Sequence, residues 1–336
     1  MTTRLRRGKV FTAVAGAAAV GALALAPHFV GAGLGGAFRA LQGASRGWLA
    51  LAVVLYAVGY LTMAGAWRTA LAARGARLPV QEVLARLGLG SIVNTFAPAR
   101  VGDAVKVALL SESLEGPDRV WTAGGLYTAL AASRALPIAA LVVVASATGA
   151  LPVWPALALV GGVAAALALG LSPVRPARWH RLAHLLDGLA ALAQSPREAA
   201  KVVAWSTGTT LARLAATSTL AAALGVHHPV LAGLVIVTAL DVAGLMPLTP
   251  GNLGVASGAV AVALAARGID ATHAVEVGIA VQTLETLVSL SAGSFGLLYL
   301  ARRRWPARPW AVRAIAVGSS LAIAAAGAIV FGLVST

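Results

Sequence analysis

The sequence predicts an all-α polytopic membrane protein with about seven transmembrane helices and two re-entrant helical hairpins in an inverted repeat. Hydrophobic residues make up 59% of its 336 residues and charged residues only 11%, whereas soluble domains carry about 25% charged residues. Apolar runs of about twenty residues, the length that crosses a bilayer as a helix, recur along the chain. Two further apolar segments are broken by proline and glycine at corresponding places in the two halves, which is typical of transporters.

The N-terminal part, residues 1–47, is predicted to be an extra transmembrane helix followed by a Gly-rich loop. Its basic start resembles that of a signal peptide. The apolar run at about 10–30 is too long for the apolar region of such a peptide, so we expect a retained span.

The first repeat is predicted at 48–171, as a span, a broken segment and two further spans: about 48–72, 81–110, 120–146 and 153–171. Each half of the broken segment has about 15 residues, too few to cross a core of about 30 Å at about 1.5 Å per residue. A re-entrant hairpin with its turn at 96–102 fits this length.

Residues 172–201 are predicted to form a basic amphipathic linker on the membrane surface, with leucines at helical spacing. The second repeat, 202–336, has the same order as the first, with the re-entrant hairpin at 230–266 and spans at about 202–224, 274–300 and 310–333.

The charges predict how the chain is oriented. The formal net charge is +15, with 26 basic and 11 acidic residues, and a cytoplasmic N-terminus places most basic loops on the cytoplasmic side. One hairpin then enters from each side of the membrane, so the halves are inverted. Orientation and contact with anionic headgroups account for the basic residues, and we expect no nucleic-acid partner. The absence of cysteine excludes disulfides and thiolate chemistry.

The first break carries several polar residues at membrane depth. Proline removes a backbone donor, and Gly102 permits a tight or left-handed turn. Arg100 and Lys106 would offer positive charge to a phosphate. The alternative is that Arg100 and Asp103 pair with each other or lie at the headgroup level. The predicted binding residues of this break are Asn94, Pro98, Arg100, Gly102, Asp103 and Lys106.

The second break predicts a turn followed by a new half-helix near Val255. The free amides and positive dipole end of such a half-helix favour an anion. The alternative is a plain loop between two short helices. The predicted binding residues here are Pro250, Gly251, Asn252 and Gly254.

Four ionisable residues fall inside predicted spans or half-helices: Arg134, Arg213, Asp241 and Glu285. Such residues normally face the bundle interior with a partner, so we expect the four to neutralise one another. The network is either structural or a site for a headgroup or for protons, with Asp241 and Glu285 as proton carriers. We expect no acidic partner for the pairs His180/His184 and His227/His228, and the chain has neither a P-loop nor a hydrolase serine. We therefore predict no metal, no cofactor and no enzymatic activity.

The spacing of the first break, Asn94-x3-Pro98-x-Arg100-x-Gly102-Asp103-x2-Lys106, resembles the membrane region of the lysylphosphatidylglycerol synthase/flippase family. The second break is similar to the Pro-Gly-Gly-x-Gly motif of that family. The resemblance covers roughly 48–300 and implies translocation of lipids or lipid-linked compounds, by a member without the aminoacyl-transferase domain. The chain departs from the family pattern at Asp103, Ser133-Arg134 with Pro137, Ser257 and Glu285.

We therefore expect a lipid transporter that moves an anionic or phosphate-bearing lipid across the bacterial cytoplasmic (inner) membrane. Its expected partners are membrane lipids with anionic headgroups. The alternative is a non-transporting scaffold or regulator of an envelope-lipid biosynthetic enzyme, which would dock on 172–201. A partner protein from envelope biosynthesis and a homo-oligomer both stay open.

Overall fold

The chain is an all-helical membrane protein, as the sequence predicts. The computed structural model describes residues 43–96, 101–149, 157, 161, 195–245 and 254–304. Within them lie eight helices and no strand: α2 (Arg46–Ala72), α3 (Val80–Phe96), α4 (Val101–Ser111), α5 (Arg119–Ala147), α8 (Pro196–Ala223), α9 (Pro229–Leu245), α10 (Val255–Ala265) and α11 (Ala271–Arg304). By length and composition, α2, α5 and α11 can each cross a membrane.

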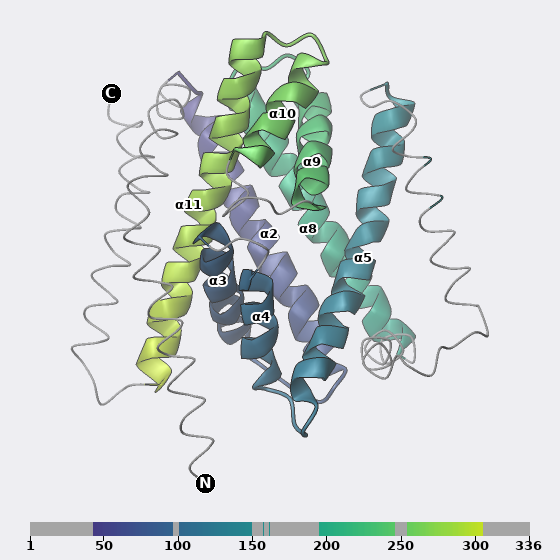
Figure 1. Ribbon diagram of the computed structural model, residues 1–336, viewed down its shortest axis with the longest axis vertical. Helices are drawn as coiled ribbons and strands as arrows, with labels where there is room; N and C mark the ends of the chain where they lie inside the picture. Colours follow the sequence, from purple (N-terminus) through teal and green to yellow (C-terminus); the bar gives the residue numbers. More distant parts are fainter. Residues whose placement is uncertain are drawn as a thin grey trace.

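Helices α2 and α8 form an antiparallel pair that runs the length of the molecule (Figure 1). At one end the Ser45 amide, just before α2, donates a 2.9 Å hydrogen bond to the carbonyl of Ala223, the last residue of α8. Further along, the Thr209 hydroxyl lies 3.0 Å from that of Thr62. At Gly65, a β-carbon would stand 2.7 Å from the Trp205 ring, so the absence of a side chain lets the helices approach.

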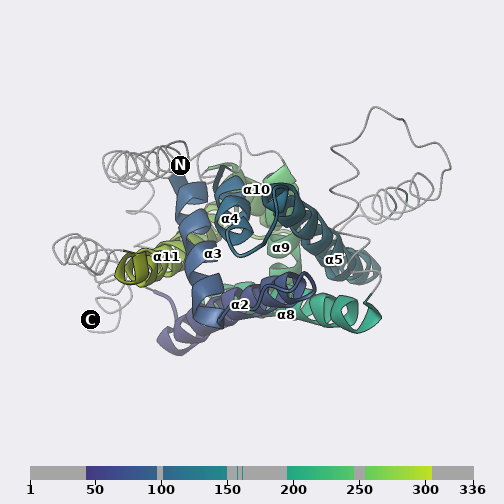
Figure 2. The same cartoon turned by 90° about the horizontal axis from the view of Figure 1, so that it is seen from below.

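Two pairs of short helices lie against this layer from opposite ends (Figures 1 and 2). The 17 residues of α3 and the 11 residues of α4 span about 25 Å and 16 Å, less than a bilayer core. The α9–α10 pair has the same two lengths. In Figure 1 the first pair fills the lower half and the second pair the upper half, with their connected ends toward the middle.

The long helices α5 and α11 flank the pairs on opposite sides (Figure 2). Helix α11 runs antiparallel to α3 at backbone distance. A β-carbon on Gly88 would lie 2.1 Å from the Ala292 carbonyl oxygen, and one on Gly296 would lie 2.3 Å from that of Ala85. The small residues on this face therefore hold the first short pair against α11.

The described helices thus follow the same order twice, with reversed directions. Helix α2, the pair α3–α4 and helix α5 come first, and α8, the pair α9–α10 and α11 follow. In Figure 1, α2 runs downward and α8 upward, while α5 runs upward and α11 downward.

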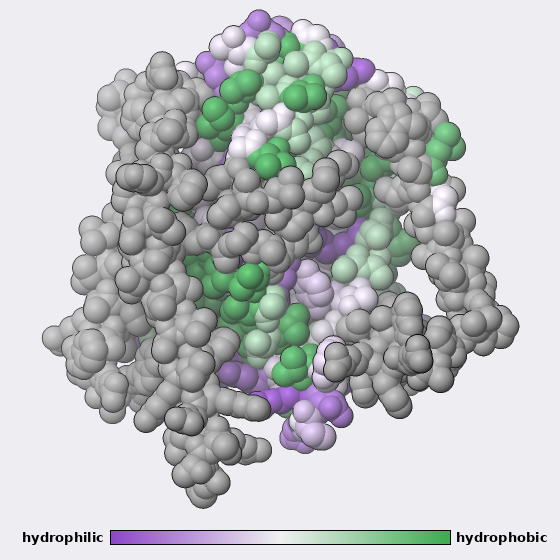
Figure 3. Space-filling view, viewed as in Figure 1, coloured by the Kyte–Doolittle hydropathy of each residue, from purple (hydrophilic) through white to green (hydrophobic). Residues whose placement is uncertain are grey.

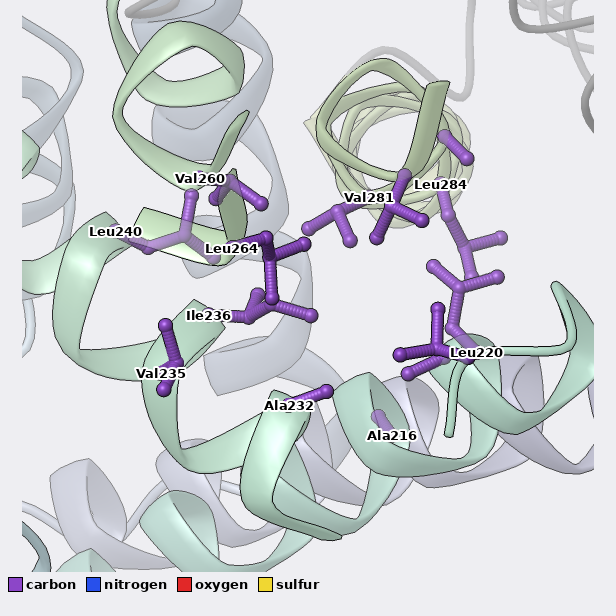
Figure 4. Packing of buried hydrophobic residues seen from close by; sticks show 14 of the residues in the cluster. Ala216, Leu220, Ala232, Val235, Ile236, Leu240, Val260, Leu264, Val281 and Leu284 are labelled. Atoms are coloured by element: carbon purple, nitrogen blue, oxygen red, sulfur yellow. The ribbon is translucent and has the colours of Figure 1, made fainter. Parts of the chain in front are cut away.

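Each short pair has its own apolar cluster. The cluster around the second pair joins α8, α9, α10 and α11, and Figure 4 shows Leu220, Ile236, Leu264 and Val281 facing one another. The other cluster packs the second half of α2 against α3, α4 and α5, with Leu71, Leu87, Leu110 and Leu126 fully buried. Burying each such side chain stabilises the fold by about 1.5–3 kcal/mol in water-based accounting, although between lipid-exposed helices close packing matters more.

The surface in Figure 3 carries its hydrophilic residues mainly at the two ends of the molecule. One end holds the connections at 73–79 and 112–118, the start of α8 and the end of α11 (Figure 1). Its basic residues include Arg74, Arg77, Arg119, Arg197, Lys201, Arg302 and Arg303. The described residues of the opposite end carry fewer bases, Arg46 and Arg267.

The observed helices lie close to the predicted segments, with one clear difference. Helix α8 already begins at Pro196, within the last residues of the segment 172–201 that is predicted as the surface linker. Proline at the first position suits a helix start because its missing amide has no partner there anyway. The spans predicted at 10–30, 153–171 and 310–333 and most of the linker lie outside the described residues, apart from single positions in 153–171.

Candidate functional site

The end of the first short pair carries a hydrogen-bonded cluster around Asp103. One carboxylate oxygen, Oδ1, accepts from Asn94 Nδ2 at 2.8 Å and from Lys106 Nζ at 3.0 Å. The other, Oδ2, accepts from the Tyr127 hydroxyl at 2.9 Å. The cluster therefore ties α3, α4 and α5 together through one half-buried carboxylate.

Two glycines make this cluster possible. A β-carbon on Gly102 would lie 2.0 Å from the Gly90 carbonyl oxygen and 2.5 Å from the Asn94 amide nitrogen. Gly102 is the second residue of α4 and lacks a positive φ. Of the two conformations predicted for Gly102, a tight or a left-handed turn, the left-handed one is therefore not adopted. Gly102 is needed because α3 and α4 approach at backbone distance, which a side chain would prevent.

Lys106, one of the two cations predicted to offer positive charge at this break, is paired within the protein. Lys106 forms an ion pair with Asp103, so it compensates a carboxylate of the chain itself. Among the described residues, the partners of Asp103 are Asn94, Lys106 and Tyr127. Pro98 and Arg100 lie outside the described residues, so their predicted roles stay predictions.

The second short pair contributes a helix start. Gly254 precedes α10 with φ +81°, a conformation that favours glycine, and α10 begins at Val255 as the sequence predicts. The first amides of a helix have no partner within the helix, and their N–H groups point outward from its N-terminal end. Pro250, Gly251 and Asn252 lie outside the described residues.

A second charged cluster lies halfway along the long helices. Arg213 on α8 donates from Nη1 to Asp241 Oδ1 at 2.5 Å and from Nε to Glu285 Oε1 at 3.3 Å. One guanidinium therefore compensates two carboxylates, one from α9 and one from α11. Tyr56 of α2 lies within electrostatic reach of Arg213 and Glu285. Its buried hydroxyl has no hydrogen-bond partner in the described part of the chain.

Arg134 does not join these ion pairs. Of the four ionisable residues that we expected to neutralise one another, Arg213, Asp241 and Glu285 form ion pairs, and no ion pair joins Arg134 to a described residue. Both acids bind Arg213, while Arg134 belongs to α5. Its half-buried side chain interacts at longer range with groups of α4, α5, α8 and α9.

Sequence reasoning missed a third cluster, at the base of the first short pair. Glu82 accepts from Arg86 Nη2 at 2.5 Å and also from Arg303 of α11. Arg86 Nη1 donates to the Leu109 carbonyl of α4 at 2.7 Å. The spacing of Glu82 and Arg86, four residues apart on one helix, was a usable signal. Nothing local indicates Arg303, which is 221 residues away.

The three clusters bring acids, bases and hydroxyls together without a metal site. Within the described ranges, no three His, Cys, Asp or Glu side chains converge as metal ligands would. The arrangement can instead place cations, polar hydrogen-bond donors and helix ends near an anionic group between the two short pairs.

A family model described as Lysylphosphatidylglycerol synthase TM region matches residues 11–293. No curated protein matches the chain.

Proposed function

Because this chain belongs to the family of the lysylphosphatidylglycerol synthase transmembrane region, we propose that it moves a phosphate-bearing lipid across the bacterial cytoplasmic membrane. The family description names a phospholipid synthase, which supports a phospholipid as the substrate. The carrying observation is that two short helix pairs, lying at opposite ends of the bundle, direct their connected ends toward its charged middle. The proposed activity is transport and not catalysis.

In the proposed architecture, the two short pairs are re-entrant hairpins in an inverted repeat with about seven spans. The reversed directions of α2 and α8, and of α5 and α11, support this arrangement. So do the lengths of the short helices, none of which can cross a bilayer core of about 30 Å. Inverted repeats allow a binding site near the midplane to open alternately to each side.

The proposed orientation follows from the basic residues at the ends of the bundle. The end with Arg74, Arg77, Arg197, Lys201, Arg302 and Arg303 is assigned to the cytoplasm by the positive-inside rule. The first short pair then enters from the cytoplasm and the second from outside. The N-terminus is cytoplasmic in this arrangement.

In the proposed mechanism, the headgroup passes between the connected ends of the two pairs while the acyl chains stay in lipid. Positively charged side chains and the free amides at the start of α10 attract the phosphate. The Asp103 and Arg213 clusters connect the short pairs to the long helices. Movement of a short pair against the long helices must rearrange these contacts, which couples headgroup passage to a conformational change.

The direct test is lipid translocation in vesicles. The purified protein is reconstituted with fluorescent phosphatidylglycerol, phosphatidylethanolamine or a neutral diacylglycerol, and appearance of the probe in the opposite leaflet is followed by dithionite quenching. We expect faster translocation of the phosphate-bearing probes than in protein-free vesicles. Equal rates with and without protein for every phosphate-bearing probe would contradict the proposal and favour the scaffold alternative.

A variant of the first break sharpens this test. We expect Arg100→Ala to abolish translocation while leaving membrane insertion intact. The control is Arg68→Gln, since Arg68 on α2 is exposed and lies outside the three clusters. If Arg100→Ala translocates lipid at the wild-type rate, the cation that attracts the phosphate is another residue of the bundle.

A further inference from the structure

Arg134 differs from the other described charged groups in the middle of the bundle. It lies near the centre of α5, one helical turn before Pro137. Its Nε atom is buried and has no hydrogen-bond partner among the described residues, and none of them forms an ion pair with its guanidinium. Lys106 and Arg213, by contrast, both bind carboxylates of the chain.

The nearby acids are already engaged by other donors. Asp103 accepts hydrogen bonds from Asn94, Lys106 and Tyr127. Asp241 and Glu285 share the guanidinium of Arg213. Arg134 is therefore attracted by Asp103 and Asp241 only at longer range, and it is repelled by Arg213.

The same interactions locate Arg134 in the fold. Asp103 belongs to α4 of the first short pair, and Asp241 belongs to α9 of the second. The Arg134 guanidinium therefore lies within electrostatic reach of one helix from each pair. The headgroup passes between these pairs in the proposed mechanism.

An arginine without a partner at membrane depth is costly. A purely structural arginine would be expected to have a carboxylate or carbonyl within hydrogen-bond distance, because buried charges are otherwise strongly destabilising. Here the described acids nearby, Asp103 and Asp241, bind other donors, and no described residue forms an ion pair with Arg134. An anion from outside the protein would complete this environment.

We propose that Arg134 binds the phosphodiester group of the transported lipid between the two short helix pairs. A guanidinium can donate two parallel hydrogen bonds to phosphate oxygens, and its single positive charge matches the single negative charge of a phosphodiester. This inference rests on the proposed function and names the atom group through which the substrate is recognised.

Equilibrium binding of a short-chain lipid to the purified full-length protein tests the site. The probe is dioctanoyl phosphatidylglycerol, measured by isothermal titration calorimetry in detergent below the critical micelle concentration of the lipid. Dioctanoylglycerol, which lacks the phosphate, is the matched probe and should not bind. We expect Arg134→Gln to weaken phosphatidylglycerol binding about ten- to a hundredfold, which is the effect of losing a charge-assisted hydrogen bond.

Two further variants complete the series. Arg134→Lys keeps the charge but loses the two-pronged geometry, so its affinity should fall between those of wild type and Arg134→Gln. Arg68→Gln removes an exposed arginine of α2 and should bind like wild type. Absence of binding by the wild-type protein, or binding by Arg134→Gln within about threefold of wild type, overturns the proposal.

The melting temperature without lipid separates a ligand-binding arginine from a structural one. If the charge of Arg134 is compensated only by a bound anion, Arg134→Gln removes an uncompensated charge from the lipid-free protein. This variant should then melt at or above the wild-type temperature. For a structural arginine, Arg134→Gln would lower the melting temperature instead. A decrease as large as that caused by Arg213→Met would overturn the proposal.

If the probe binds through Arg134 but vesicles show no translocation, the site stands and the transport function fails. If vesicles translocate lipid and Arg134→Gln binds normally, the function stands and the site fails.

Discussion

Arg213 of α8 donates a 2.5 Å hydrogen bond to Asp241 of α9, and the same guanidinium reaches Glu285 of α11 at 3.3 Å. This relationship joins one short helix to two long helices in the middle of the bundle. The side chains of all three residues are less than a third exposed. Water therefore screens these charges only in part, and the ion pairs compensate them.

Removal of Arg213 should destabilise the protein strongly. Arg213→Met leaves two carboxylates without their cation, which we expect to cost about 3–5 kcal/mol in the free energy of unfolding. The measurement is thermal or denaturant unfolding in detergent. The triple variant Arg213→Met, Asp241→Leu, Glu285→Leu removes the whole cluster and should recover most of the loss. A triple variant no more stable than the single one would contradict the cluster.

Gly102 should be intolerant of even one methyl group. Gly102→Ala places a β-carbon 2.0 Å from the Gly90 carbonyl oxygen, so α3 and α4 must separate at a cost of about 1–3 kcal/mol. Gly258→Ala on α10 is the matched control, since a β-carbon there meets nothing within 4 Å. That control should be neutral or gain about 0.5–1 kcal/mol from helix propensity. Equal melting temperatures for the two variants would show that the α3–α4 approach is looser than described.

The two ends of the bundle should be labelled from opposite sides of the membrane. The chain has no cysteine, so Glu115→Cys and His227→Cys each introduce a single exposed thiol without other changes. A membrane-impermeant maleimide should label His227→Cys in intact cells and Glu115→Cys only in inside-out vesicles. Labelling of both thiols from one side would be incompatible with the bundle spanning the membrane, and exchanged sides would reverse the proposed orientation.

Two tyrosines should respond differently to loss of the hydroxyl. The buried Tyr56 hydroxyl has no hydrogen-bond partner among the described residues, so Tyr56→Phe should leave the melting temperature unchanged or raise it. Tyr60, one turn later on α2, shares a 3.0 Å hydrogen bond with Ser289 of α11. Tyr60→Phe should therefore cost about 0.5–1.5 kcal/mol in the free energy of unfolding. A larger loss for Tyr56→Phe than for Tyr60→Phe would point to a partner of the Tyr56 hydroxyl.

At the break of the first short pair, the sequence predicts the position of the interruption but not the contacts around it. The proline and glycine pattern predicts where the apolar segment is interrupted, and α3 and α4 end and begin at Phe96 and Val101. The reason why position 102 needs a glycine was not predictable, because it depends on how closely α3 approaches α4. The partner of Asp103 was equally open from the sequence, since Arg100 and Lys106 both lie one turn away along the chain.

The sequence by itself determined that this protein is a helical membrane protein, where its apolar segments are broken and which ionisable residues interrupt them. These are local properties, because an apolar run and a proline act on their own segment of chain. Only the tertiary structure decided how the buried charges divide. Whether Asp241 and Glu285 pair with Arg213 or Arg134 depends on which helices are neighbours, and α8 rather than α5 brings its guanidinium within hydrogen-bond distance of both.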